Sequence, residues 1–266
     1  MSTIRIRFFL LSALLILSSC SIKEDRSSCP CQLTVDLSEV LDAGITPPSW
    51  WDCGLTLMIF TGDREFGSMR CRYEEALPEY DFLVPKGEIG VSGVLGLSKG
   101  ILSRHEIRFP EGVESDKLFV SAKTVACYGE TARTGLEMNK QFTHVEIAGL
   151  ESFDYHMEVT AGYSGLDILT CLPLEGRFRV PISCGEDGLC RFRLPRQGTD
   201  DVMILFFNDE GQLDNAIPLG KYLTEVGYDW SARSLADVSI RIDFVTASLQ
   251  IMVGDWTQQI DFSYVL

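Results

Sequence analysis

The sequence is poor in histidine and lacks the short motifs that mark common enzyme sites. Only His105, His144 and His156 occur in 266 residues, and they are far apart. The sequence has no Cys-x-x-Cys pair and no histidine at ligand spacing, the patterns that would indicate a metal centre. A nucleophile elbow, a metalloprotease helix, a phosphate-binding loop and a dinucleotide fingerprint are also missing. We therefore expect no enzymatic activity, no metal, no cofactor and no small-molecule substrate.

Neighbouring acids leave one enzymatic alternative open. The pairs Glu74-Glu75 and Asp200-Asp201 could in principle serve a glycoside hydrolase, although chance pairs are expected among 38 acidic residues. That alternative predicts two carboxylates facing each other across a pocket, about 5–10 Å apart. Solvated surface loops are the other interpretation of these pairs.

Positive charge is scarce as well. Lysine and arginine together number 23 against 38 acids, a formal net charge of -15. Nucleic-acid binding requires clustered basic side chains, so this balance argues against it, and also against docking on an anionic bilayer by charge. One group departs from this trend: alternation places Arg177, Arg179, Arg191 and Arg193, close to Arg196, on the outward face of neighbouring strands. They could contact an acidic partner subunit, or act as edge charges that discourage aggregation.

The first apolar run is too short to cross a membrane. It extends over ten residues, Phe8 to Leu17, after the basic Arg5 and Arg7, whereas a spanning helix needs about twenty. This pattern predicts a signal peptide over residues 1–19. The sequence Leu17-Ser18-Ser19-Cys20 resembles the lipobox of bacterial lipoproteins, which implies that Cys20 is acylated and becomes the new N-terminus. An ordinary signal peptide with an incidental Cys20 is the alternative.

Residues 20–31 are predicted to form a tether between the lipid and the folded body. The polar run Ser21 to Arg26 somewhat resembles the export signal of Bacteroidetes surface lipoproteins, which implies an outer-membrane location facing the exterior. Removal of residues 1–19 leaves 21 basic and 38 acidic residues, a formal charge of -17. Such a charge suits a body that stands off a like-charged surface.

Eight cysteines remain after Cys20, and export permits disulfides among them. Eight thiols allow 105 pairings, so spacing alone leaves most pairings undecided. Cys184 and Cys190 lie on either side of a short turn and could form a disulfide at the tip of a hairpin. Cys29 and Cys31 are too close to bond comfortably to each other. Free, buried thiols are the alternative for several of the eight.

Alternation of apolar and polar residues is the dominant pattern, and it predicts an all-β protein of half-buried antiparallel strands. A linker at 129–140, where this period is lost, would divide the chain into two β-sandwiches, 32–140 and 141–266. One short helix is expected at 219–226, with Gly227 as its cap. The expected strands are 33–37, 55–60, 89–94, 118–122, 155–161, 178–182, 190–194, 202–207, 239–244, 249–253 and 260–264.

Several segments resemble the fimbrial anchor lipoproteins of Bacteroidales. The N-terminal part shares the lipobox, the run 20–26, and Cys29-Pro30-Cys31 leading into a strand. The resemblance implies two transthyretin-like β-sandwiches in tandem and a basal subunit that attaches a type V pilus to the outer membrane. It implies a fimbrial shaft subunit as partner, joined by β-strand complementation. The C-terminal half shares the segments 192–197, 219–223, 227–230, 235–244 and 253–256.

The C-terminal segment and a tryptophan pair leave two further questions open. Ile260, Phe262 and Tyr264 form an alternating face suited to strand exchange, or else the last strand of their own sandwich. Trp50-Trp51 could stack on a sugar ring or plug one end of the first sandwich. The stacking interpretation belongs to the alternative function, a surface glycan-binding lipoprotein with a β-sandwich fold.

Overall fold

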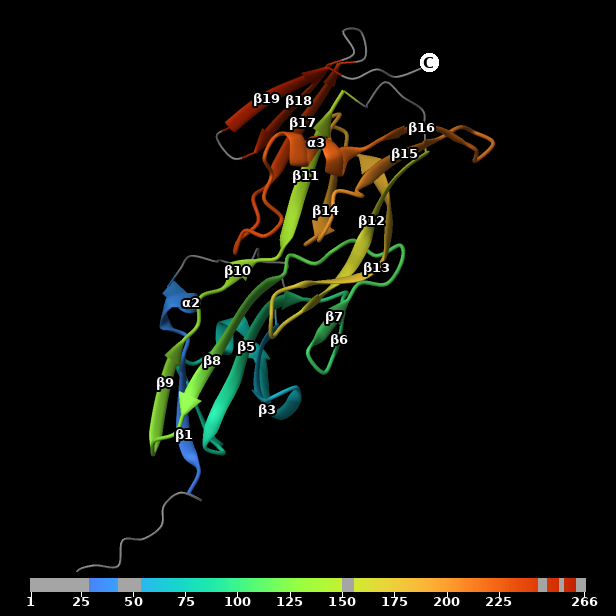
Figure 1. Cartoon of the computed structure of the whole chain (residues 1–266). Helices are drawn as coiled ribbons and strands as arrows, with labels where there is room; N and C mark the ends of the chain where they lie inside the picture. The colour runs from blue at the N-terminus through green and yellow to red at the C-terminus, as the bar shows by residue number, and fades with distance from the viewer. Residues whose placement is uncertain (1–28, 43–53, 150–155, 244–247, 254–255, 262–266) are drawn as a thin grey trace, which may run out of the picture.

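The computed structural model describes residues 29–42, 54–149, 156–243, 248–253 and 256–261. Nearly all of the regular structure is β-strand, so the all-β fold predicted from the alternation is confirmed. The molecule is elongated (Figure 1), with the first strand entering at one end and the last three described strands at the other. No helix among these residues is long and apolar enough to cross a membrane.

The first half consists of two sheets that pack face to face. The smaller has the order β4 (Glu79–Val84), β1 (Cys31–Asp36), β9 (Thr131–Gly135). The larger has the order β10 (Asn139–Lys140), β8 (Phe119–Cys127), β5 (Gly87–Leu97), β2 (Gly54–Thr61), β3 (Arg64–Arg72). Leu33 and Val35 of β1 meet Leu57 and Ile59 of β2 in a fully buried core. Two short helices, α2 (Ser38–Asp42) and η2 (Tyr73–Glu75), follow β1 and β3.

The second half is built on one long sheet around a separate core. Its order is β16 (Leu213–Ile217), β15 (Met203–Phe207), β12 (His156–Asp167), β13 (Pro173–Cys184), β14 (Cys190–Pro195), β11 (Phe142–Ala148), β17 (Val238–Asp243), β18 (Ser248–Val253), β19 (Trp256–Asp261). Val159, Phe178, Phe192 and Ile240 share one core cluster. The helix α3 (Leu219–Glu225) adds Leu219 and Leu223 to that core.

The β12–β13 hairpin reaches from the second half into the first. Residues Gly165 to Asp167 of β12 pair with β7 (Glu106–Arg108), which in turn pairs with β6 (Ile101–Ser103). A third core cluster therefore mixes Met58 and Phe60 of β2 with Leu166 and Ile168 of the hairpin. The hydroxyl of Ser92 donates to the Ile168 carbonyl at 2.7 Å. Sheet pairing changes near residue 140, where a boundary was predicted, but the two halves share buried surface through this hairpin.

The predicted strands up to 249–253 correspond to observed strands, and Gly227 follows α3 with a φ of 77°. Of the predicted strand 260–264, only residues 260 and 261 are described, at the end of β19. The predicted linker at 129–140 is wrong, because β9 and β10 lie within it. β9 pairs in parallel with β1, yet its residues Thr-Ala-Arg-Thr-Gly include no large apolar side chain. An edge strand held mainly by backbone hydrogen bonds shows no hydrophobic period, which explains the error. The strands β3, β4, β6, β7, β11 and β16 were also not predicted.

Candidate functional site

The outer edge of β19 is an open strand edge at the end of the molecule farthest from β1 (Figure 1). β19 pairs with β18 from Trp256 opposite Val253 to Asp261 opposite Ser248, and the sheet order ends there within the described ranges. Ile260 lies opposite Leu249 in this ladder, so it belongs to β19, the last described strand of its own sheet. Phe262 and Tyr264 lie outside the described residues. Since no strand among the described residues pairs with the outer edge of β19, a further strand could add to it.

The composition of β19 differs from that of the edge strand β3. The edge strand β3 carries four charged side chains in nine residues, a common protection against unwanted strand pairing. β19 reads Trp-Thr-Gln-Gln-Ile-Asp and carries a single charge at its last residue. On the neighbouring β18, Gln250 and Met252 are exposed while Ile251 is buried. The β19 edge is thus both open and poorly protected by charge.

The four outward arginines predicted from the alternation are each paired with an acid. Two of these pairs stay within the second half: Arg179 contacts Glu158, and Arg191 contacts both Glu146 at 2.8 Å and Asp187 at 2.7 Å. The pairing explains why Arg191 lowers the pKa of Asp187. An open basic patch is therefore absent at these four positions, and contact with a partner subunit stays a prediction.

The other two arginines of this group connect the halves. Arg193 donates to Glu114 and, at 2.8 Å, to the Ser115 carbonyl. Arg177 lies 3.6 Å from Glu111. These acceptors belong to the loop 110–117 of the first half, whose Gly112 N–H also donates to the Arg179 carbonyl at 2.8 Å. The arginines thus fasten this loop to β13 and β14.

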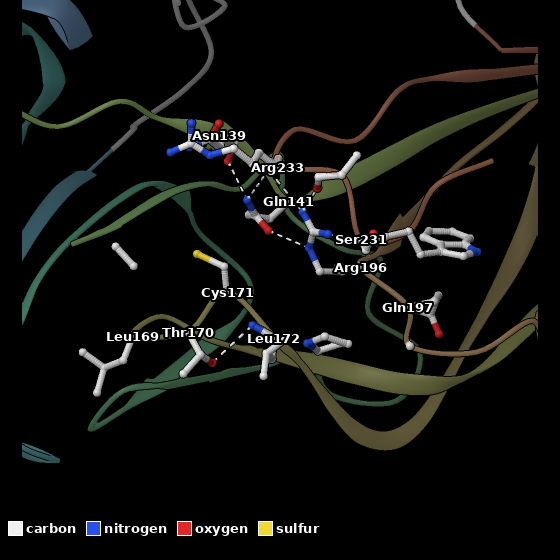
Figure 2. A pocket seen from close by; sticks show the side chains of 15 residues that line it. Asn139, Gln141, Leu169, Thr170, Cys171, Leu172, Arg196, Gln197, Ser231 and Arg233 are labelled. Atoms are coloured by element: carbon white, nitrogen blue, oxygen red, sulfur yellow. Dashed lines mark hydrogen bonds between the residues drawn. The ribbon is translucent and has the colours of Figure 1, made fainter. Parts of the chain in front are cut away.

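Arg196 is buried, in contrast to the arginines before it. Only 4% of its surface is exposed, and burial lowers the pKa of its guanidinium. Its Nε donates to the Gln141 side chain at 2.8 Å, and its terminal nitrogens donate to the carbonyls of Trp230, Ala232 and Arg233. Gln141 in turn donates to the Asn139 and Arg233 carbonyls. This network holds the segment 230–233 against the junction between the halves (Figure 2).

A pocket of about 480 Å³ lies beside this network. The Cys171 side chain from the β12–β13 turn faces the Arg196 and Gln141 side chains across it in Figure 2. Burial raises the pKa of the Cys171 thiol. No carboxylate lines the pocket, and a second pocket near β3 has Glu65 as its single acid. Neither pocket offers the pair of carboxylates that the hydrolase alternative predicts.

The other candidate residues are distributed as follows. The structure contains a disulfide between Cys184 and Cys190, the pair singled out in the sequence. His156 is exposed beside Glu158, and within the described ranges no three potential ligands gather around a metal position. Glu74 and Glu75 lie in the exposed η2 turn, and Asp201 accepts a hydrogen bond from Thr199. Cys20, Trp50 and Trp51 lie outside the described residues.

The junction network was not identified from the sequence. Gln141, Arg196 and Gln197 carry no hydrophobic period, and their burial depends on contacts between segments that lie 34 to 92 residues apart. The one available signal was the position of Arg196 directly after Pro195, at the end of a strand whose earlier arginines point outward. β14 ends at Pro195, so Arg196 no longer follows the inward and outward alternation of that strand.

The fold is that of solved fimbrial and adhesin proteins of Bacteroidales, so the resemblance seen in the sequence is confirmed at the level of the fold. A proposed polysaccharide-binding protein of the DUF1812 group from Bacteroides thetaiotaomicron matches with a TM-score of 0.61 at 12% identity, covering 86% of this chain and 98% of that chain. A proposed adhesin from Bacteroides ovatus gives 0.57 at 12%, covering 90% and 97%. The fimbrial anchor protein Mfa2 from Porphyromonas gingivalis gives 0.56 at 10%, covering 89% and 100%. No family model and no curated protein matches the sequence.

Proposed function

We propose that this protein is a non-enzymatic, lipid-anchored basal subunit that attaches a fimbria to the outer membrane. Cys20 carries the lipid, and a strand of the fimbrial shaft subunit adds to the outer edge of β19. The fold shared with a fimbrial anchor protein supports a role in fimbriae, and the lipobox supports the anchor. The tandem transthyretin-like architecture belongs to the same proposal.

The observation that carries the proposal is the position of two features at opposite ends of the molecule. β1, which follows the predicted tether, begins at one end, while the open edge of β19 lies at the other (Figure 1). A basal subunit needs this arrangement, because its membrane attachment and its filament contact have to be separated. Backbone hydrogen bonds along an added strand would supply affinity without a large apolar interface.

Proline substitutions in β19 test the filament contact. In an antiparallel ladder, successive residues direct their N–H groups alternately toward the neighbouring strand and away from it. One of Gln258 and Gln259 therefore has an outward N–H, and proline there removes a docking donor. We expect this variant to retain about tenfold fewer fimbriae on cells, the effect of losing about 1.4 kcal/mol of binding. Immunogold counts of cell-bound fimbriae measure it.

The two single variants form a matched pair. In one of Gln258→Pro and Gln259→Pro the lost N–H points toward β18, so that variant loses a hydrogen bond of the β18–β19 ladder. Thermal unfolding identifies it by its lower Tm, and the other variant is then the one that lacks the outward donor. Asp214→Pro, on the opposite edge strand β16, is the control for a proline at a sheet edge and should retain fimbriae. Full retention of fimbriae by both β19 variants would contradict docking at this edge.

A glycan-binding surface lipoprotein is the second candidate function. It is favoured by the similarity in fold to the proposed polysaccharide-binding protein of the DUF1812 group. In this candidate Trp50 and Trp51 stack on sugar rings. If it is correct, the double variant Trp50→Ala/Trp51→Ala loses retention on glycan columns by about tenfold or more, with fimbriae intact. Retention equal to that of the wild type would remove this candidate.

A further inference from the structure

Two buried cysteines face each other where the two sheets of the first half converge. Cys31 is the first residue of β1, in the small sheet, and Cys127 is the last residue of β8, in the large sheet. Both are fully buried members of one core cluster, and Cys31 acts on the Cys127 thiol as a near neighbour. They are free thiols in the structure, as are Cys29, Cys71 and Cys171.

The strand registers explain why these two side chains meet. Cys31 lies opposite Val84 at the end of β4, and Cys127 lies opposite Gly87 at the start of β5. Only Pro85 and Lys86 separate Val84 from Gly87, so the chain crosses there from one sheet to the other. Packed sheets are normally about 10 Å apart, and so short a connection draws them together at this point.

A second connection closes the same end of the sandwich. Cys127 is followed by residues 128–130 and then by Thr131 of β9, which pairs with Gln32. The Gln32 N–H donates to the Glu130 carbonyl at 2.8 Å. Two short crossings thus flank the pair of cysteines and keep their backbones close, as a disulfide requires.

We propose that Cys31 and Cys127 form a second disulfide in the exported protein, which joins β1 to β8. The oxidant is a disulfide-bearing protein or small molecule of the oxidising compartment. Its S–S bond breaks as the new S–S bond forms, and the two electrons and two protons of the Cys31 and Cys127 thiols convert it to two thiols. Burial, with Cys31 nearby, raises the pKa of the Cys127 thiol to about 11, so the exchange takes place before this end of the core closes.

The bond would strengthen the path along which force enters the body. The tether leads directly into β1, which lies between β4 and β9 in a sheet of three strands. Without the bond, β1 contacts the large sheet through the apolar core that the two sheets share. With it, a pull on the tether is transmitted covalently to β8, an interior strand of the larger sheet. This mechanical role rests on the proposed anchor function, whereas the bond itself requires only export.

Mass spectrometry of the full chain tests the pairing. The protein is expressed with its own leader, purified from the membrane fraction, denatured in N-ethylmaleimide without reductant, and digested. We expect a peptide containing Cys31 linked to a peptide containing Cys127, while Cys71 and Cys171 carry maleimide. Because Cys29 and Cys53 share the tryptic peptide 27–64 with Cys31, a Cys29→Ser/Cys53→Ser variant assigns the link. Maleimide on both Cys31 and Cys127, or a link through Cys29, would overturn the proposal.

Thermal unfolding with and without reductant gives an independent measurement. A bond that closes a loop of about 100 residues should make the Tm of the wild type fall by about 10 °C on reduction. Cys31→Ala/Cys127→Ala should lose only the smaller contribution of the Cys184–Cys190 bond, and Cys71→Ala/Cys171→Ala should respond as the wild type does. Equal shifts in all three proteins count against the bond. Free Cys31 and Cys127 in cells that still hold fimbriae would overturn the bond and leave the anchor function standing.

Discussion

Replacing Cys20 by alanine is expected to leave fimbriae detached from the cell. In the proposed anchor, the acyl chains carried by Cys20 would contribute about 0.8 kcal/mol for each buried methylene, and more than one chain would make attachment stable. The fraction of fimbriae that sediments with cells should therefore fall about tenfold or more, with the remainder in the medium or unassembled. Quantitative immunoblots of the cell pellet and the medium measure this fraction.

A matched control separates loss of the lipid from loss of a cysteine. Cys29→Ala removes an exposed thiol nine positions farther along and should leave the cell-bound fraction unchanged. Detergent-phase partition of the Cys20→Ala protein shows directly whether the anchor is missing. An anchor protein without its lipid that still holds fimbriae on cells would contradict the basal role. A Cys20→Ala protein that keeps its detergent partition would instead show that the lipid is carried elsewhere.

Strands with one face on a core could be predicted from alternation, and strands held by backbone pairing could not. β14, Cys-Arg-Phe-Arg-Leu-Pro, buries Phe192 and Leu194 and directs Arg191 and Arg193 outward, as the period requires. β9 pairs with β1 through main-chain groups and carries no such signal. Its pairing depends on residues about a hundred positions away, which no local pattern records.

The acidic partners of the four outward arginines could not be predicted from the sequence either. Outward placement followed from the strand period, but the partner acids did not. Glu111 and Glu114 lie in a loop of the other half, about seventy residues away in sequence, and come close only through the shared hairpin and junction. The strand period therefore predicts which side chains reach the surface, but not whether that surface attracts an acidic partner.

Replacement of Arg196 by alanine is expected to cause a large loss of stability. The guanidinium donates to one side-chain oxygen and three carbonyls, and the exposed fraction of Arg196 is 4%. Truncation leaves the Gln141 side-chain oxygen and the Trp230 and Ala232 carbonyls without the guanidinium donor, while the Arg233 carbonyl keeps its bond from Gln141. Hydrogen bonds to a charged group contribute roughly 1.5–3 kcal/mol each. Because water will reach some of the acceptors through the adjacent pocket, we expect a loss of about 3–5 kcal/mol in the free energy of unfolding. Urea unfolding at neutral pH measures it.

Arg233 provides the matched control at the same junction. Its side chain is 76% exposed and lies 3.6 Å from Glu137, so Arg233→Ala should change the free energy of unfolding by less than about 0.5 kcal/mol. Hydrogen exchange locates the damage: Arg196→Ala should speed exchange most in residues 230–236, a segment that the guanidinium holds through the carbonyls of Trp230, Ala232 and Arg233, and least in β5. If Arg196→Ala costs no more than Arg233→Ala, the halves are held together by the shared hairpin core, and the buried guanidinium merely fills space at the junction.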